Sequence, residues 1–204
     1  MNYLKELIYR IRGEYTTEKL IKMGMRVGEN FTRLNDVILD PAHCWLIEIG
    51  NNVTMAPRVH VLCHDASTKQ FIGYTKIGGV KVGNNVFVGA DTVILPSVTI
   101  GNNVIIGAHS TVTHDITDNS VVVGSPAKII CSLDEYLGKE KKRMKNSKCY
   151  GEEYTLRKNV SMEMRVDDSC DLSLELSAVN GTIKYYDGEV IKVEADNVDR
   201  DYEF

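Results

Sequence analysis

The feature that most constrains the fold of this chain is a six-residue period of aliphatic side chains near its middle. Six aliphatic residues follow one another at intervals of six without a slip: Val82, Val88, Ile94, Ile100, Ile106 and Val112. This period is typical of a parallel β-helix, in which each unit forms one short strand with its leading side chain pointing inward. An amphipathic helix would need apolar residues every three or four positions. The stretch therefore predicts a mainly β fold built from hexapeptide repeats.

The residues between the aliphatic positions suit the corners of such a coil. Glycine follows four of the six aliphatic residues, and Asn84–Asn85 and Asn102–Asn103 stand between repeats. Asparagine tolerates the left-handed backbone angles that tight corners require. A second regular phase precedes the period at residues 49–61, and less regular repeats precede that phase at residues 27–31 and 34–39. We therefore expect the coil to occupy residues 25–131.

Residues 65–79 interrupt the period with polar residues and three glycines, directly after His64 and Asp65. A long excursion from a regular coil is uncommon and often functional. The interruption therefore marks His64 as a candidate for chemistry.

Helical patterns flank the coil. Apolar residues at helical spacing predict an amphipathic helix over residues 2–12 and a second, short helix over residues 17–23, with Thr16 or Thr17 as its cap. Ser132 is the expected cap of a helix over residues 133–145, which has acidic residues in its first turn and lysines in its last. Residues beyond 150 contain alternating apolar positions that favour strands. The expected organisation is an N-terminal helical segment (1–24), the β-helix (25–131) and a C-terminal helix with a small tail region (132–204).

Composition excludes several classes of protein. The net charge of −4 offers no overall basic field for nucleic acid. No apolar segment is long enough for membrane insertion, and no signal peptide pattern is present, so a cytoplasmic protein is expected. The five cysteines are odd in number and form no CxxC pair, which favours reduced thiols acting as small hydrophobes.

The coil resembles the hexapeptide-repeat acyltransferases, in particular the galactoside, maltose and polysaccharide O-acetyltransferases. Five stretches carry this resemblance: Ile49-Gly-Asn-Asn-Val53, Ala56-Pro57 with His64-Asp65 after it, Val82 to Gly89, Gly107 to Ile116, and Gly124-Ser-Pro-Ala127. The resemblance implies a left-handed parallel β-helix, a homotrimer and acetyl-CoA bound between adjacent subunits. It also implies transfer of the acetyl group to a hydroxyl of a sugar or polysaccharide precursor.

By the same resemblance, His64 is the general base. A sugar hydroxyl is a poor nucleophile at neutral pH, and an imidazole is suited to remove its proton as it attacks the thioester. Acyl transfer is then direct, without an acyl-enzyme.

The resemblance also assigns binding residues. The acetyl-CoA site is expected to include Ala90, Ala108, Thr113, His114 and Lys128, with the backbone N–H near Ala90 donating to the thioester oxygen. The family usually has lysine where this chain has His114, and a basic residue where it has Cys131. Asn35 and Asp65 are the residues expected to contact the acceptor.

Two alternative functions remain open. The γ-type carbonic anhydrases share this coil and bind a metal through histidines at a subunit interface. His60, His64, His109 and His114 are the candidate ligands, and zinc held by three imidazoles would generate hydroxide near neutral pH. The acetyltransferase reading requires no metal. The third class is a trimeric scaffold without activity, because fold does not fix function.

Overall fold

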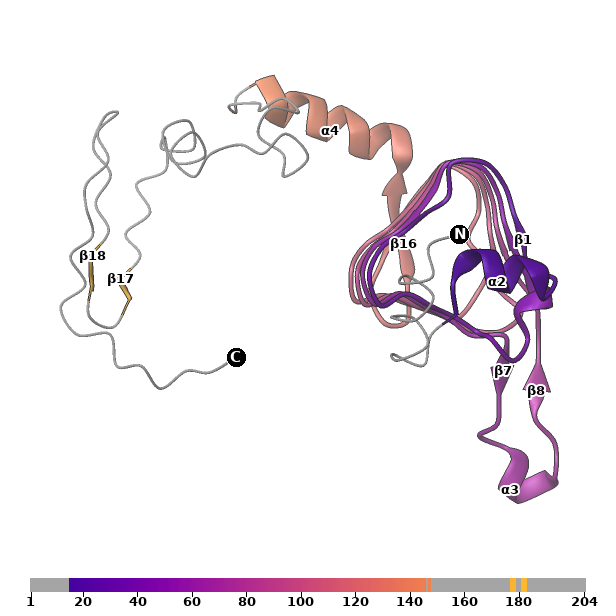
Figure 1. The fold of residues 1–204 in the computed structure, drawn as a ribbon. Coiled ribbons are helices and arrows are strands. Elements are labelled where there is room, and N and C mark those ends of the chain that lie inside the picture. Colours follow the sequence, from indigo (N-terminus) through magenta and orange to yellow (C-terminus); the bar gives the residue numbers. More distant parts are fainter. Residues whose placement is uncertain (1–14, 146, 148–176, 179–180, 183–204) are drawn as a thin grey trace. The chain divides into compact units, whose positions relative to one another are not determined.

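The computed structural model of the chain describes residues 15–145, 147, 177–178 and 181–182 (Figure 1). The chain divides into two compact units, residues 1–143 and 144–204. The first unit contains the coil and the second a short hairpin of β17 (Ser177–Ala178) and β18 (Gly181–Thr182). The helix expected over residues 2–12, and most of the tail strands expected beyond residue 150, lie outside the described residues.

The coil of the first unit has three faces, as the prediction of a left-handed parallel β-helix requires. Face A contains β1 (Arg26–Val27), β4 (Ile47–Ile49), β9 (Val80–Val82) and β12 (Thr99–Ile100). Face B contains β2 (Thr32–Arg33), β5 (Val53–Met55), β10 (Val86–Val88), β13 (Val104–Ile106), β15 (Ser120–Val123) and β16 (Lys128–Ser132). Face C contains β3 (Ile38–Leu39), β6 (His60–Val61), β11 (Val93–Ile94) and β14 (Thr111–Val112). Neighbouring strands within each face are parallel up to β15, so the fold prediction is confirmed.

The six-residue period forms the core. All six leading side chains point inward and are at most 4% exposed. They pack in one continuous hydrophobic cluster with the buried residues of the earlier, less regular repeats. Removing this apolar surface from water is the main favourable term in folding the coil.

Corner AB, which joins face A to face B, is built from asparagine. Five asparagines one coil apart adopt φ values of +55° to +56°: Asn30, Asn52, Asn85, Asn103 and Asn119. The side-chain amide of each donates to the side-chain oxygen of the next, at 2.9 to 3.0 Å. The predicted use of asparagine in left-handed corners is confirmed, and the ladder satisfies polar groups that an isolated turn would leave to water.

Glycine is needed beside this corner because successive coils approach closely. A Cβ atom on Gly83 would lie 2.6 Å from the carbonyl oxygen of Gly101, and one on Gly50 would lie 2.6 Å from the carbonyl oxygen of Gly83. Both distances are too short for any side chain, so the glycines fix how closely the coils stack.

Two helices are found where they were expected. Helix α2 (Thr17–Lys22) begins after Thr16, whose hydroxyl accepts from the Lys19 N–H at 3.2 Å. Helix α4 (Leu133–Lys145) begins after Ser132, whose hydroxyl accepts from the Glu135 N–H at 3.2 Å. No helix among the described residues has the length and apolar character needed to cross a membrane.

The parallel coil ends after β15, with a reversal that the sequence did not predict. After β15 the chain turns through residues 124–127 and returns as β16, which pairs antiparallel with β15. The antiparallel strand occupies the open edge of face B and leads directly into α4.

Candidate functional site

Both large departures from the repeat occur at corner CA, which joins face C to face A. The first lies between β3 and β4 and includes the short 3-10 helix η1 (Cys44–Leu46). The second follows β6 and forms a hairpin of β7 (His64–Asp65), α3 (Lys69–Ile72) and β8 (Lys76–Ile77) that projects from the coil (Figure 1). His64 lies at the base of this hairpin, beside the first departure.

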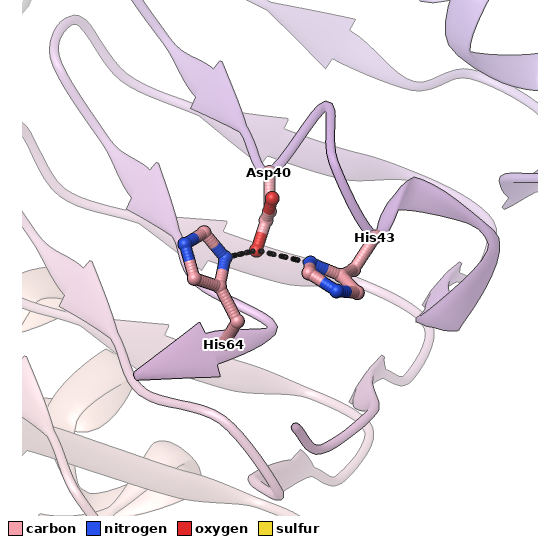
Figure 2. Close-up of side chains that lie close together, drawn as sticks. All are labelled: Asp40, His43 and His64. Atoms are coloured by element: carbon pink, nitrogen blue, oxygen red, sulfur yellow. Dashed lines mark hydrogen bonds and ion pairs between the residues drawn. The ribbon is translucent and has the colours of Figure 1, made fainter. Parts of the chain in front are cut away.

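Asp40 is the centre of a hydrogen-bonded cluster at this corner (Figure 2). Its residue is 2% exposed, and its Oδ2 atom accepts from the Cys63 backbone N–H at 2.9 Å and contacts His64 Nδ1 at 2.5 Å. Its other oxygen accepts from the Ala42 backbone N–H at 3.1 Å. The carboxylate therefore connects the two departures of the coil and fixes the His64 ring.

The hydrogen bond to Asp40 determines which nitrogen of His64 carries the proton. A carboxylate oxygen only accepts, so Nδ1 of His64 must donate and carries the hydrogen. The lone pair of the neutral ring is then on Nε2. Because 38% of the His64 side chain is exposed, an alcohol from solvent can approach this nitrogen.

The charge state of Asp40 supports this assignment. Burial raises the pKa of the Asp40 carboxyl, but the hydrogen bonds from His64, Cys63 and Ala42 outweigh that effect, and the pKa lies below its ordinary value. The carboxylate is thus ionised at neutral pH and stabilises positive charge on His64 when the ring accepts a second proton.

A second imidazole adjoins the pair. His43 Nδ1 lies 3.8 Å from Asp40 Oδ2, and the His43 and His64 ring centroids are 5.0 Å apart. The Nδ1 atom of His43 is buried and has no hydrogen-bond partner among the described residues. His43 also contacts Trp45, with the ring centroids 5.3 Å apart.

The thiols at this corner are not nucleophiles. Cys63 is fully buried, and burial together with the charge of Asp40 raises its pKa to about 11. Burial also raises the pKa of Cys44, which is fully buried. The expectation that the cysteines are small hydrophobes is confirmed for these two. Cys131 is half-buried, and Cys149 and Cys170 lie outside the described residues.

Ala90 and Ala108 lie together on corner BC, which joins face B to face C. They occupy successive coils, and the His109 N–H donates to the Ala90 carbonyl at 2.8 Å. No acceptor among the described residues takes the Ala90 N–H. That N–H is therefore a candidate donor to a bound group.

The other predicted acetyl-CoA residues divide between two corners. Thr113 and His114 are at corner CA, where Thr113 Oγ1 lies 2.8 Å from His114 Nδ1. Lys128 is exposed and begins β16 opposite Val123, whose side chain lies against Gly107, so Lys128 is at the corner-BC end of face B, near Ala108. Within one chain Thr113 and His114 are therefore separated from Ala90, Ala108 and Lys128.

The residues predicted to contact the acceptor also separate. Asn35 is exposed at corner BC, whereas His64 is at corner CA. Asp65 lies next to His64, but one of its oxygens accepts from the Ser67 N–H at 2.9 Å and the other lies 3.4 Å from Lys76 Nζ. These contacts give Asp65 a role in holding the hairpin.

The four histidines of the metal hypothesis are likewise dispersed within one chain. His60 is on β6, His109 is at corner BC near Asp91, and His114 is two coils from His64. Among the described residues, the group whose donor atoms are close enough to bind one metal is Asp40, His43 and His64, within 4.8 Å of one another. Only His64 belongs to both sets.

Asp40 and His43, with Trp45 in contact with His43, are the residues at this corner that sequence reasoning missed. The signal was the interruption between β3 and β4, which is shorter than the one at 65–79 and looks like a degraded repeat. If the two interrupted coils are aligned at the ends of β3 and β6, Asp40 falls next to the residues that precede His64.

A shallow groove on the outer surface of face A does not coincide with this corner. It is lined by charged and small residues, among them Arg26, Glu48, Lys81, Asn84 and Asp118. It contains none of the predicted site residues, so the candidate site is at corner CA.

Known proteins that are similar to this chain match its coil region. The profile of the family "Bacterial transferase hexapeptide (six repeats)" matches residues 79–114. Protein CapG of Staphylococcus aureus is 39% identical over 139 residues, which cover 65% of this chain and 81% of CapG. The galactoside O-acetyltransferase of Escherichia coli is 36% identical over 119 residues, covering 55% of this chain and 56% of that enzyme.

Among solved structures, a maltose O-acetyltransferase from Clostridium difficile 630 is similar to this chain. It is 42% identical, with a TM-score of 0.48, over 53% of this chain and 59% of that one. The chain thus spans between one half and two thirds of the galactoside and maltose enzymes.

Proposed function

The chain belongs to the hexapeptide-repeat acyltransferase family, whose acetyltransferases use acetyl-CoA as co-substrate, and on this premise we propose that it acetylates a hydroxyl group of a sugar or polysaccharide precursor. The observation that supports this best is the Asp40–His64 pair at the interrupted corner. It presents a partly exposed imidazole whose Nε2 atom has no hydrogen-bond partner among the described residues, and whose positive charge has a buried counter-ion.

The reaction we propose needs one proton acceptor and one hydrogen-bond donor. His64 Nε2 takes the hydroxyl proton while the hydroxyl oxygen attacks the thioester carbonyl carbon. The carbon–sulfur bond then breaks, and the proton returns from His64 to the departing CoA sulfur. Asp40 stabilises the charged ring between these two transfers, as an orienting carboxylate does in other acyl-transfer sites.

The negative charge on the thioester oxygen needs the donor. The Ala90 N–H is suited to this role because no described acceptor occupies it and because backbone donors need no reorganisation. Ala108, one coil further on, leaves room for the pantetheine arm. Lys128 is the residue we propose for a CoA phosphate, as a point charge.

Direct transfer to the acceptor is supported by the thiols. A cysteine attacks a thioester as the thiolate, and the pKa of Cys63 near 11 keeps this neighbour of His64 protonated at neutral pH. An acyl-enzyme on Cys63 is therefore not part of the mechanism.

The separation of the site residues supports a homotrimer. His64 is on corner CA, and Ala90 and Ala108 are on corner BC, on opposite sides of face C. We propose that corner CA of one protomer faces corner BC of the next, so that each site takes its base from one chain and its oxyanion donor from another.

Thiol release from acetyl-CoA tests the activity. We expect release with one or more sugars in a panel that also contains serine and aminoglycosides, and a loss of about 10²- to 10⁴-fold in His64→Ala. Wild-type turnover in His64→Ala, with retained circular dichroism, contradicts the assignment of the base.

Mixed trimers test the shared site. His64→Ala and Ala108→Phe are each expected to be inactive alone, whereas coexpressed chains form some interfaces with an intact His64 and an intact Ala108. Recovery of activity on coexpression supports a site between protomers. No recovery, with mixed trimers verified by differential tags, contradicts it.

The metal-dependent alternative is supported by a different set of donors from the one expected. Asp40, His43 and His64 are close enough to bind an ion, although the short Asp40–His64 contact would have to open. Stoichiometric zinc or iron in purified protein, with hydration of carbon dioxide that chelators abolish, would favour this function over acetyl transfer.

A further inference from the structure

Trp45, the one tryptophan of the chain, lies beside the candidate site with nearly half of its surface exposed. It belongs to η1, in the same interruption that supplies Asp40 and His43. Exposure of so large an apolar side chain costs free energy that burial would recover. Its place next to a candidate base makes Trp45 a candidate to bind a ligand.

The backbone that carries Trp45 is firmly anchored. Its neighbour Cys44 is fully buried, and the Cys44 thiol lies within 3.9 Å of the backbone carbonyl oxygens of Leu20 and Met23 at the end of α2. At Gly24, a Cβ atom would lie 2.9 Å from the Trp45 Cβ, so only glycine permits this approach. The indole is thus solvated but held on a fixed base, which lowers the entropy cost of binding a ligand on it.

One imidazole contacts both the indole and the candidate base. Trp45 contacts His43 with the centroids 5.3 Å apart, and His43 contacts His64 with the centroids 5.0 Å apart. The indole and the base thus share one neighbour, so a ring-shaped acceptor bound on the indole would have its hydroxyl groups in the neighbourhood of His64.

We propose that the Trp45 indole is the stacking platform for a pyranose ring of the acceptor. A pyranose presents one face of C–H groups, which packs on an aromatic face, and a rim of hydroxyl groups, which an aromatic side chain leaves free. Trp45 and His43 would bind the apolar face, and the rim would deliver a hydroxyl to His64. This inference rests on the proposed acetyl transfer to a sugar and adds the element that selects the sugar ring.

The emission of Trp45 gives a direct binding measurement, because no other tryptophan contributes. We expect methyl β-galactoside or maltose, whichever supports thiol release, to change the intensity or wavelength of Trp45 emission with saturation near its KM. Serine and glycerol, which have hydroxyl groups without a pyranose face, are expected to leave the emission unchanged.

Substitution separates stacking from a structural role. Trp45→Ala is expected to raise the KM for the sugar by about tenfold, with little change in kcat or in the KM for acetyl-CoA, and Trp45→Phe to restore most of the loss. Ile21→Ala is the matched control, because Ile21 is 46% exposed on α2 next to the same segment. It is expected to leave both KM values unchanged.

Two results would overturn the proposal. One is an unchanged sugar KM in Trp45→Ala while the wild-type protein still acetylates sugars, which leaves the proposed function intact. The other is a Trp45 emission that changes with protein concentration but not with added sugar, together with a smaller assembly in Trp45→Ala. That result would assign the indole to a contact between protomers. Failure of every sugar in the thiol-release panel would instead contradict the proposed function.

Discussion

Corner AB and corner CA are made by the same coils, yet they differ in almost every respect. Corner AB repeats one residue type at one backbone conformation through five coils, and the side chains of these five asparagines bond to one another. Corner CA has two departures from the repeat, which bring together a buried carboxylate and the imidazoles of His43 and His64. The β-helix derives stability from a corner that repeats and obtains chemistry from a corner that does not.

The lengths of successive coils express the same difference. Asparagines that stack at corner AB are separated by 22, 33, 18 and 16 residues in turn. The two shorter coils follow the repeat, and the two longer ones carry the segment that holds Asp40, His43 and Trp45 and the hairpin after His64. Because both extra segments leave and rejoin the coil at one corner, the core resumes its register unchanged.

The largest effect on corner CA is expected from Asp40→Asn. An amide in place of the carboxylate removes the counter-ion of His64, and its N–H groups cannot accept from both the His64 ring and the Cys63 N–H. We therefore expect kcat to fall by roughly 10- to 1,000-fold, with little change in the KM for acetyl-CoA. Steady-state kinetics measure both. Asp118→Asn at corner AB, which keeps an oxygen for the Asn102 N–H, is the control. Equal kcat in wild type and Asp40→Asn would mean that His64 acts alone.

The next effect concerns the regular corner. Gly83→Ala places a methyl group 2.6 Å from the Gly101 carbonyl oxygen, and forcing the coils apart should destabilise the protein by about 1–3 kcal/mol. Urea unfolding followed by circular dichroism measures it. Gly138→Ala in α4, where no atom lies within 4 Å of the new methyl group, should cause no loss. Similar midpoints for both variants would show that the coils tolerate wider spacing.

A smaller loss is expected at the asparagine ladder. Asn85→Ala removes the hydrogen bonds with Asn52 and Asn103. It also places alanine, which disfavours left-handed backbone angles, at a φ near +56°. Together these changes should lower the free energy of unfolding by about 1 kcal/mol. Asn85→Gly loses the same bonds without the backbone cost and should be less destabilised. The reverse order in urea unfolding would argue that the side-chain bonds, and not the left-handed conformation, explain the asparagines.

The smallest effect is on the pH dependence of stability. The pKa of Asp40 in the folded protein lies below its ordinary value of 3.8, so the unfolded state binds more protons near that pH. The stability that ionised Asp40 contributes is present above about pH 5 and is lost as the pH falls through 3.8 and below. Unfolding free energies between about pH 5 and pH 3 should therefore depend less on pH in Asp40→Asn than in wild type. Parallel curves would mean that the hydrogen bonds to Asp40 do not favour its charged form.

Much of the architecture was predictable because the period leaves few alternatives. Val82, Val88 and Ile94 could share one core only in short strands, and Asn85 and Asn103 suited only left-handed corners. The caps of α2 and α4, Thr16 and Ser132, were likewise predictable, since capping depends on residues within one turn. The antiparallel return of β16 was not, because pairing with β15 depends on which edge of face B remains open.

The site was predictable in part. His64 stands at an interruption that the sequence displays, but Asp40 is 24 residues earlier and carries no motif of its own. Its role depends on the irregular coil between β3 and β4 returning to a position beside Cys63, which periodicity does not specify.

The sequence by itself determined which side chains point inward and which residues turn the corners, because both follow from local spacing and local backbone preference. Only the tertiary structure decided that Asp40, His43, Trp45 and His64 meet at one corner while Ala90 and Ala108 lie on another. Contacts between coils depend on the register in which the coils stack, and that register is set by the whole length of each coil and not by any six residues within it.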